Sequence, residues 1–179
     1  MKLDYSFIYF LLISTLLITA NAHAKGTYQQ PEEFISNAFS QQMPEPDIIW
    51  IKGELRQKIE KILQHKYKAK RIRYWKKLQR SVWVLEEVGK KKPITVGIVI
   101  DDNKISQLKV LIFRETRGWE VRYPFFSKQF NQLSITDTDE LNGTIDGISG
   151  ATLSVRALTK LARIALLLNQ QVLLIESKK

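Results

Sequence analysis

The middle of the chain alternates between apolar and polar positions with a period of two, which is typical of strands that bury one face. The clearest run contains Ile94, Val96, Ile98 and Ile100, and the polar segment 101–104 that follows it has turn chemistry. The alternation predicts a series of strands over residues 70–78, 81–88, 94–100, 105–113 and 119–123. Because these strands follow one another in the manner of hairpins, we expect an antiparallel sheet.

Apolar positions at helical spacing predict helices on both sides of this series. Pro31 to Phe39 begins with proline and two acidic residues, as helix starts do, and Met43 to Pro46 is typical of a stiff linker. The other predicted segments are a helix over 53–63, a short helix over 125–133, a loop over 134–148 and a last helix from about 152 to 168. The fold class that follows is α+β, with an antiparallel sheet and flanking helices.

The N-terminus has the pattern of a secretory signal peptide. Lys2 precedes an apolar run from Phe7 to Ile18, and the next residues end in Ala22-His23-Ala24. The alternative is an uncleaved membrane anchor, but a spanning helix needs roughly 20 apolar residues and this run has twelve. We therefore expect cleavage after Ala24, export to the periplasm and no other membrane-crossing stretch. Residues 25–52 are then an N-terminal extension with a short helix, and residues 53–179 form one domain.

Composition removes several kinds of chemistry. The 179-residue chain has no cysteine and two histidines, His23 and His65. Disulfides, thiolate metal sites, iron–sulfur clusters and c-type haem are thus excluded, and we expect no metal site. A histidine-based zinc site or a Ser-His-Asp triad has almost nothing to be built from. Any redox or group-transfer chemistry would therefore come from a bound cofactor.

Positive charge is concentrated in residues 52–92, which contain fifteen basic residues and four acidic ones. The whole chain has a net charge of +10, so this segment accounts for all of the excess. Within it, Lys66 to Lys77 interleaves basic and aromatic residues, as binders of single-stranded nucleic acid do. The alternation of Arg71 and Arg73 with Ile72 and Tyr74 is equally typical of a strand with a solvated face. Since export removes the protein from cellular nucleic acid, we expect an anionic partner or membrane phosphates instead.

The segment Asp146-Gly147-Ile148-Ser149-Gly150-Ala151-Thr152-Leu153-Ser154 is a loop of small residues that leads into the last helix. Unpaired N–H groups and the positive end of the helix dipole make such a start a site for anions. Gly147 and Gly150 would let the backbone approach a ligand closely. The alternative is a plain helix cap supplied by one of two hydroxyls, those of Ser149 and Thr152.

The same segment resembles the flavinylation motif of the FMN-binding domain family, Asp-x-x-(Ser/Thr)-Gly-Ala-(Ser/Thr). That family includes the Rnf G subunit and the C subunit of the sodium-pumping NADH:quinone reductase. In the family, an ApbE-type flavin transferase takes FMN from FAD and joins its phosphate to the hydroxyl of the last motif residue. The resemblance implies covalent FMN on Thr152, with a flavin site that also includes Asp146, Gly147, Ser149, Gly150, Ala151 and Ser154.

A weaker match lies upstream, and the resemblance as a whole spans roughly residues 80–170. Family members often contain His-x-Glu-Thr-Pro-Gly-Leu-Gly near the flavin, which resembles Phe113 to Glu120 here. Glu115, Thr116 and Gly118 match and are implied as cofactor-binding residues, whereas the other specified positions differ. Two further sets have open interpretations: Arg114, Arg117 and Arg122 would approach the flavin or lie on a solvated strand face, and Trp119 and Tyr123 would stack on its ring or belong to the core.

The function implied is that of an exported flavoprotein that carries FMN and transfers electrons between redox partners in the periplasm or membrane. The flavin would do the redox chemistry. The expected partners are a flavin transferase and an acidic redox partner, with membrane association peripheral if present and no nucleic acid. Two alternatives stay open: a non-redox basic module that binds anionic lipid or polymer, and a flavin-dependent reductase of a small substrate.

Overall fold

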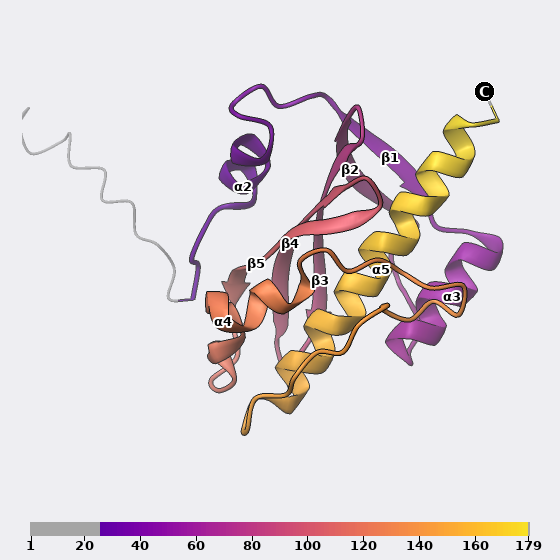
Figure 1. The fold of residues 1–179 in the computed structure, drawn as a ribbon. Coiled ribbons are helices and arrows are strands. Elements are labelled where there is room, and N and C mark those ends of the chain that lie inside the picture. Colours follow the sequence, from indigo (N-terminus) through magenta and orange to yellow (C-terminus); the bar gives the residue numbers. More distant parts are fainter. Residues whose placement is uncertain (1–25, 179) are drawn as a thin grey trace, which may run out of the picture.

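The computed structural model describes residues 26–178, so the predicted signal peptide and its cleavage site lie outside the described residues. One antiparallel sheet has its five strands in chain order, β1-β2-β3-β4-β5 (Figure 1). The strands are β1 (Pro46–Trp50), β2 (Arg71–Lys77), β3 (Arg80–Val88), β4 (Pro93–Asp101) and β5 (Lys104–Phe113). The α+β fold class with an antiparallel sheet is thus confirmed.

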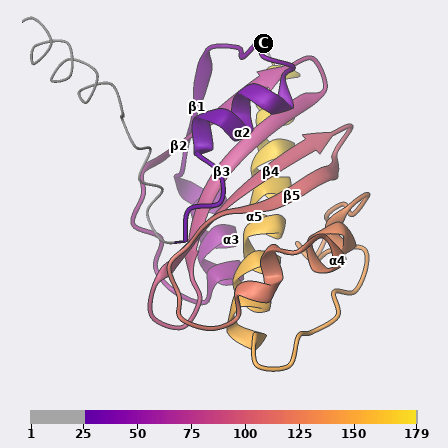
Figure 2. The ribbon, with the colours of Figure 1, turned by 90° about the vertical axis from the view of Figure 1, so that its left-hand side faces the viewer.

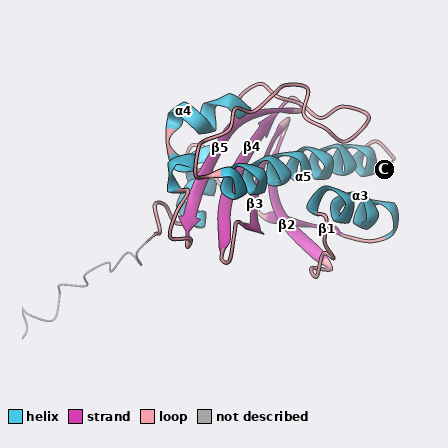
Figure 3. Cartoon of the chain, turned by 90° about the horizontal axis from the view of Figure 1, so that it is seen from below, coloured by secondary structure: helices cyan, strands magenta, loops and turns pink. Residues whose placement is uncertain are grey.

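Helices cover both faces of this sheet, as Figures 2 and 3 show. The long α5 (Thr152–Glu176) and α3 (Gly53–Leu63) lie on one face, where they bury the main apolar core. On the other face, α2 (Pro31–Ala38) packs over Val82, Val99 and Leu111. Close packing there depends on Gly97 of β4, because a Cβ at this position would lie 2.4 Å from the Phe34 ring.

The two edges of the sheet differ. Along β5 the N-terminal segment adds hydrogen bonds: Phe113 N–H donates to Gly26 O (2.7 Å), and Tyr28 N–H donates to Leu111 O (2.8 Å). Within residues 26–178, no strand pairs with the outer side of β1. The covered edge and the open edge are therefore at opposite ends of the strand order.

The predicted strand over 119–123 is wrong. Gly118 adopts a left-handed conformation with φ of 82°, and the next residues form a 3-10 helix, η2 (Trp119–Arg122). A residue with positive φ turns the chain out of its extended course, and the alternation of apolar and polar side chains does not reveal such a turn. The short helix predicted over 125–133 is divided into α4 (Pro124–Ser127) and η3 (Lys128–Phe130).

The sequence analysis missed one strand and ended one helix too early. Pro46, assigned to a stiff linker, begins strand β1, in which only Ile49 is buried. Helix α5 continues to Glu176 instead of ending near 168. Contrary to expectation, α5 is long and apolar enough to cross a membrane by length and composition, but 56% of its most apolar window is buried inside the fold, as in the core helix of a globular domain.

Candidate functional site

The loop of small residues does run into a helix, and Thr152 is the first residue of α5. Ala151 occupies the N-cap position, and no side chain caps this helix start. The backbone closes the turn instead, because Ala151 N–H donates to Ile148 O (2.9 Å) and Val155 N–H donates to Ala151 O (3.0 Å). The alternative of a plain helix cap by a Ser149 or Thr152 hydroxyl is therefore wrong, and the exposed Thr152 side chain is free for another role.

Thr152 faces a pocket of about 370 Å³ that combines three segments distant in sequence. Its other lining residues come from the turn between β3 and β4, from the segment after β5 and from the start of α5: Lys90, Lys91, Glu115, Thr116, Arg117, Gly150, Ala151, Leu153 and Ser154. Pockets that hold small ligands typically have about 300–1,000 Å³. The structure thus brings the two predicted motifs together around one cavity.

Glu115 organises one wall of this pocket. Its Oε1 accepts backbone N–H donors from Lys90, Lys91 and Lys92, the last at 2.8 Å. Burial raises the pKa of this carboxyl, but the three N–H donors outweigh that effect and the pKa is lowered overall. Glu115 therefore fixes the β3–β4 turn in place and so presents Lys90 and Lys91 toward the pocket.

Gly118 allows the segment after β5 to lie against the first turn of α5. A Cβ on Gly118 would be 2.5 Å from Ser154 Oγ and 3.4 Å from Ala151 Cα. Ser154 is consequently buried, with 4% of its surface exposed, whereas Thr152 is exposed. Of the two hydroxyls on this helix turn, Thr152 is the one that an attaching enzyme could reach.

The loop before α5 is open. Asp146 is exposed, and its backbone N–H donates to Gln129 Oε1 (2.8 Å). No heavy atom lies within 4 Å of a Cβ built on Gly147 or Gly150, and Gly150 has φ of 82°. Ser149, the remaining motif hydroxyl, is exposed in the turn next to Gly150. Neither glycine therefore packs against a neighbour, and Gly150 leaves space in the pocket that Thr152 lines.

The three arginines that flank the upstream motif separate in the structure. Arg117 lines the pocket. Arg114 points toward the sheet face opposite α5, where its guanidinium donates to Thr95 Oγ1 (2.9 Å) and Pro93 O (3.2 Å). The strand-face interpretation therefore fits Arg114, and Arg117 is the one that joins the site.

Arg122 is surrounded by aromatic rings outside the pocket. Its guanidinium carbon lies 4.4 Å from the Tyr28 ring centre, 5.1 Å from that of Trp119 and 4.9 Å from that of Tyr123. Trp119 and Tyr123 are 40% and 38% exposed, so neither belongs to the core. These rings hold an arginine by cation–π contacts at the surface.

Sequence reasoning missed Lys90 and Lys91 as site residues, because it counted them only within the basic segment. A signal was nevertheless present. β4 pairs with β5 from Ile94↔Phe113 onward, which places the turn before β4 and the segment after β5 at the same end of the sheet. The predicted hairpins therefore imply that Lys90 and Glu115 are neighbours.

The fold and the site together define a small α+β domain with an exposed hydroxyl, an uncapped helix start and three cationic side chains around one pocket. This donor set suits a ligand that carries a phosphate. Residues 89–167 match the family model of the FMN-binding domain. The match indicates a flavin-binding protein. Comparison with curated proteins and with solved structures finds no match.

The matched region covers the part of the chain that forms the Thr152 pocket. It begins at the β3–β4 turn and includes β4, β5, both motifs and most of α5. The elements α2, β1, α3, β2 and β3 all precede it. The residues that line the pocket beside Thr152 therefore all lie within the matched region.

Proposed function

We propose that this protein is an exported carrier of covalently bound FMN that transfers electrons between redox partners. The observation that supports the proposal most directly is the position of Thr152. Its exposed side chain occupies the first position of an uncapped helix, beside a pocket lined by Lys90, Lys91 and Arg117, within the region that matches the FMN-binding domain model. When bound, the flavin supplies the redox chemistry, and the protein supplies attachment, orientation and electrostatics.

The attachment step follows from the chemistry of the groups. Thr152 Oγ1 would attack the FMN-side phosphorus of FAD in the active site of an ApbE-type transferase. The phosphorus–oxygen bond to the adenylate breaks, AMP leaves, and the hydroxyl proton passes to a base of the transferase. The product is a phosphodiester between FMN and Thr152, which retains one negative charge.

That charge would meet a favourable environment. The start of α5 stabilises a nearby anion by about 0.3–1 kcal/mol at an exposed site. Lys90, Lys91 and Arg117 add three cations around the same pocket. Glu115 does not oppose them as a free carboxylate, because its Oε1 already accepts three N–H donors.

A covalent bond suits a protein that works outside the cytoplasm. A flavin that dissociates there is lost by dilution, whereas a tethered one keeps a high effective concentration at its site. The carrier would receive electrons from one periplasmic or membrane partner and pass them to another. Export itself is tested by N-terminal sequencing of periplasmic protein, which we expect to begin at Lys25; an intact Met1 would make the protein membrane-anchored instead.

The central experiment is co-expression with a flavin transferase, followed by mass spectrometry of the intact protein. We expect a mass gain of one FMN less one water, and a flavin that survives denaturation. Thr152→Ala should remove the flavin while circular dichroism stays unchanged, and Thr152→Ser should retain at least part of it. Ser154→Ala is the matched control for loss of a hydroxyl on the same turn and should keep the flavin.

Peptide mapping assigns the modified residue among the three motif hydroxyls, those of Ser149, Thr152 and Ser154. A fully flavinylated Thr152→Ala protein would overturn the attachment site. An unmodified wild-type protein beside a transferase that modifies its own substrate would overturn the function. Asp146→Ala should reduce modification, since the transferase is expected to recognise the whole motif.

A further inference from the structure

Strands β2 and β3 separate midway along their length. They pair only from Tyr74↔Trp83 to Lys77↔Arg80, next to the turn that joins them. Beyond Tyr74, β2 continues to pair with β1 as far as Arg71, while β3 continues to pair with β4 as far as Val88. The sheet is therefore split along this line over part of its height.

A cleft of about 480 Å³ occupies the split. Residues 71–73 of β2 form one wall and residues 84–86 of β3 form the other, with Ile48, Tyr67 and Trp75 completing the lining. Helix α2 covers the sheet over Val82, Val99 and Leu111, and so leaves this part of the outer face uncovered. The cleft is thus a concave feature of the sheet face opposite α5.

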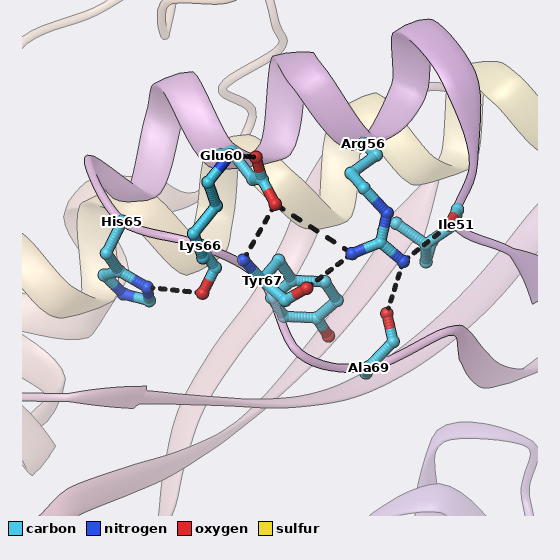
Figure 4. Close-up of polar contacts among 7 residues, drawn as sticks. All are labelled: Ile51, Arg56, Glu60, His65, Lys66, Tyr67 and Ala69. Carbon is cyan, nitrogen blue, oxygen red and sulfur yellow. Dashed lines mark hydrogen bonds and ion pairs between the residues drawn. The ribbon is translucent and has the colours of Figure 1, made fainter.

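Beside the split, a local network ties the chain at the start of β2 to helix α3 (Figure 4). The Arg56 guanidinium donates to the carbonyl oxygens of Ile51 (2.8 Å), Ala69 (3.0 Å) and Tyr67. Glu60 Oε1 accepts the Tyr67 N–H at 3.1 Å. The chain on both sides of the β1–β2 pair is thus held by α3 at the end where β2 is separate from β3.

The split leaves backbone hydrogen-bonding groups facing the cleft. In an antiparallel strand, successive residues direct their N–H and C=O groups to opposite neighbours. Lys70 O accepts from Ile51 N–H at 2.9 Å on the β1 side, so the backbone groups of Arg71 and Arg73 face β3. Trp75 faces Val82 by the same alternation, which turns Val84 and Glu86 toward β2. Within residues 26–178, no strand pairs with these four residues on that side.

The walls are positively charged on the β2 side. Arg71 and Arg73 are exposed, and Lys68 and Lys70 precede them on the loop that Arg56 holds. On the β3 side, the Glu86 carboxylate accepts from Thr95 Oγ1 and from Arg114, 3.3 Å away, which offsets its charge. An extended ligand in the cleft would therefore meet unpaired backbone groups flanked by cations.

We propose that this cleft binds an extended acidic segment of a partner protein, which adds a strand beside β2 while its carboxylates meet Arg71, Arg73 and the neighbouring lysines. Strand addition supplies the backbone hydrogen bonds, and the side chains supply selectivity for acidic residues. A lipid surface fits less well, because a bilayer is flat and its headgroups cannot complete a row of both N–H and C=O groups. The proposal does not rest on flavin attachment.

The location nevertheless suits a redox partner. Strand β3 leads from the cleft wall at Glu86 into the turn that contains Lys90 and Lys91, and these lysines line the Thr152 pocket. A partner segment seated beside β2 would therefore bring its parent protein to the flavin end of the sheet.

The test uses the purified full chain and a fluorescently labelled twelve-residue peptide of alternating glutamate and valine. Fluorescence anisotropy should report saturable binding. Arg71→Glu with Arg73→Glu should weaken it at least roughly tenfold, equivalent to about 1.4 kcal/mol. The control, Lys104→Glu with Lys128→Glu, makes the same charge change at exposed sites elsewhere and should leave affinity within about twofold, because screening limits distant charges.

A second arm separates strand addition from charge attraction. The same peptide, N-methylated at alternate residues, keeps its carboxylates but loses the N–H donors of one edge. At least one of the two methylation phases should abolish binding, because it removes the donors that face β2, and loss in both phases would mean that the strand also bonds to β3. Equal affinity of all three peptides would overturn the proposal, as would binding to vesicles of anionic phosphatidylglycerol by a protein that ignores the peptides.

Blocking the cleft gives a third arm, for which the chain is suited because it has no cysteine. Ile48→Cys labelled with a bulky maleimide should prevent peptide binding, since Ile48 lines the cleft. Leu78→Cys with the same label is the matched control, because Leu78 is 84% exposed in the β2–β3 turn, outside the cleft lining. Unchanged binding by the labelled Ile48 variant would place the peptide elsewhere.

Discussion

Two regions of this molecule hold chain segments in place with charged side chains of opposite sign: the region around the Thr152 pocket, which we call the flavin end, and the region around Arg56, which we call the Arg56 end. At the flavin end, one Glu115 oxygen accepts the N–H groups of Lys90, Lys91 and Lys92. At the Arg56 end, Arg56 donates to three carbonyl oxygens, those of Ile51, Tyr67 and Ala69. Each charged side chain holds a short segment that leads into a strand. We refer to them as the Glu115 clamp and the Arg56 clamp.

The consequences for the sheet differ. The Glu115 clamp joins the turn before β4 to the segment after β5, which lie at the same end of the β4–β5 pair. It therefore holds neighbouring strands together and forms one wall of the Thr152 pocket. The Arg56 clamp ties the sheet to a helix beside the cleft, where β2 is separate from β3. The Glu115 carboxylate binds backbone N–H groups and leaves the lysine side chains unbound by it, whereas the Arg56 guanidinium binds backbone carbonyl groups.

The clamps also differ in their relation to the family. Glu115 lies inside the region that matches the FMN-binding domain model, while Arg56 and the three carbonyls lie before residue 89. The flavin end therefore follows the family, and the Arg56 end belongs to the part of this chain that precedes it. Variants of the two ends should accordingly separate flavin loading from partner binding.

The largest effect is expected from Gly118→Ala, which acts on the contact that closes the flavin end. Alanine at φ of 82° is strained, and its Cβ would lie 2.5 Å from Ser154 Oγ. Together these terms should destabilise the fold by about 2–4 kcal/mol, measured by urea unfolding. Flavin loading should fall as well, because the helix start must move.

The steric part of that loss has its own control. Gly118→Ala combined with Ser154→Ala removes the hydroxyl from the clash and should recover part of the stability, leaving the cost of the positive φ. Ser154→Ala alone should change stability by less than about 1 kcal/mol. No recovery in the double variant would mean that the helix start, and not the Ser154 hydroxyl, limits the approach.

Arg56→Ala tests the other clamp. Loss of a charged donor to three carbonyl oxygens should cost about 2 kcal/mol in unfolding free energy. The amides of residues 64–70 should exchange hydrogen faster, while flavin loading stays at the wild-type level. Arg56→Lys, which keeps the charge but not the forked donors, should resemble alanine. Flavin loss in Arg56→Ala would show that the two ends are coupled.

How far the sequence predicts this fold depends on whether an element buries one face. Strands β2 to β5 and helix α3 have regular apolar spacing, because each places every second strand residue, or one helix face, in the main core under α5. Strand β1 buries only Ile49, so alternation left no signal there. The false strand at 119–123 has apolar spacing but follows Gly118, whose positive φ turns the chain.

The candidate site likewise has a part that the sequence predicts and a part that it does not. The segment 146–154 was readable because its chemistry is contiguous and Thr152 begins the helix that follows. The roles of Lys90 and Lys91 depend on Glu115, more than twenty residues away, and on backbone N–H groups that any residue provides. The Arg56 clamp beside the split likewise depends on carbonyl groups, and carbonyls leave no trace in the pattern of side chains.

Glu115→Ala should have a smaller effect on stability than Arg56→Ala. The three N–H donors belong to exposed residues, so water replaces much of what the carboxylate supplied, and we expect a loss of about 1 kcal/mol. Hydrogen exchange at Lys90, Lys91 and Lys92 should accelerate, and FMN loading should decline as the lysines lose their position. Glu115→Gln keeps an acceptor oxygen and should retain most of the loading; identical behaviour of the two variants would assign the role to charge alone.

The smallest effects are pH-dependent, and they should have opposite signs at Glu115 and His65. The pKa of Glu115 is lowered, so its stabilising contribution is present above the usual value of 4.5 and is lost as pH falls through the folded-state pKa. His65 follows α3, and its Nε2 is 3.1 Å from Glu87 near the end of β3. The hydrogen bond to the Lys66 carbonyl, followed by that to Glu87, raises the pKa of His65, while Lys160 near the same carboxylate opposes this slightly. Charged His65 therefore stabilises the fold below pH 6.5, and the contribution is lost as pH rises through the higher folded-state pKa.

Urea unfolding of wild type and His65→Gln between pH 5 and 9 measures this contribution as a difference that shrinks with rising pH. A difference that grows with pH, or one that Glu87→Gln leaves intact, would contradict the assigned partner.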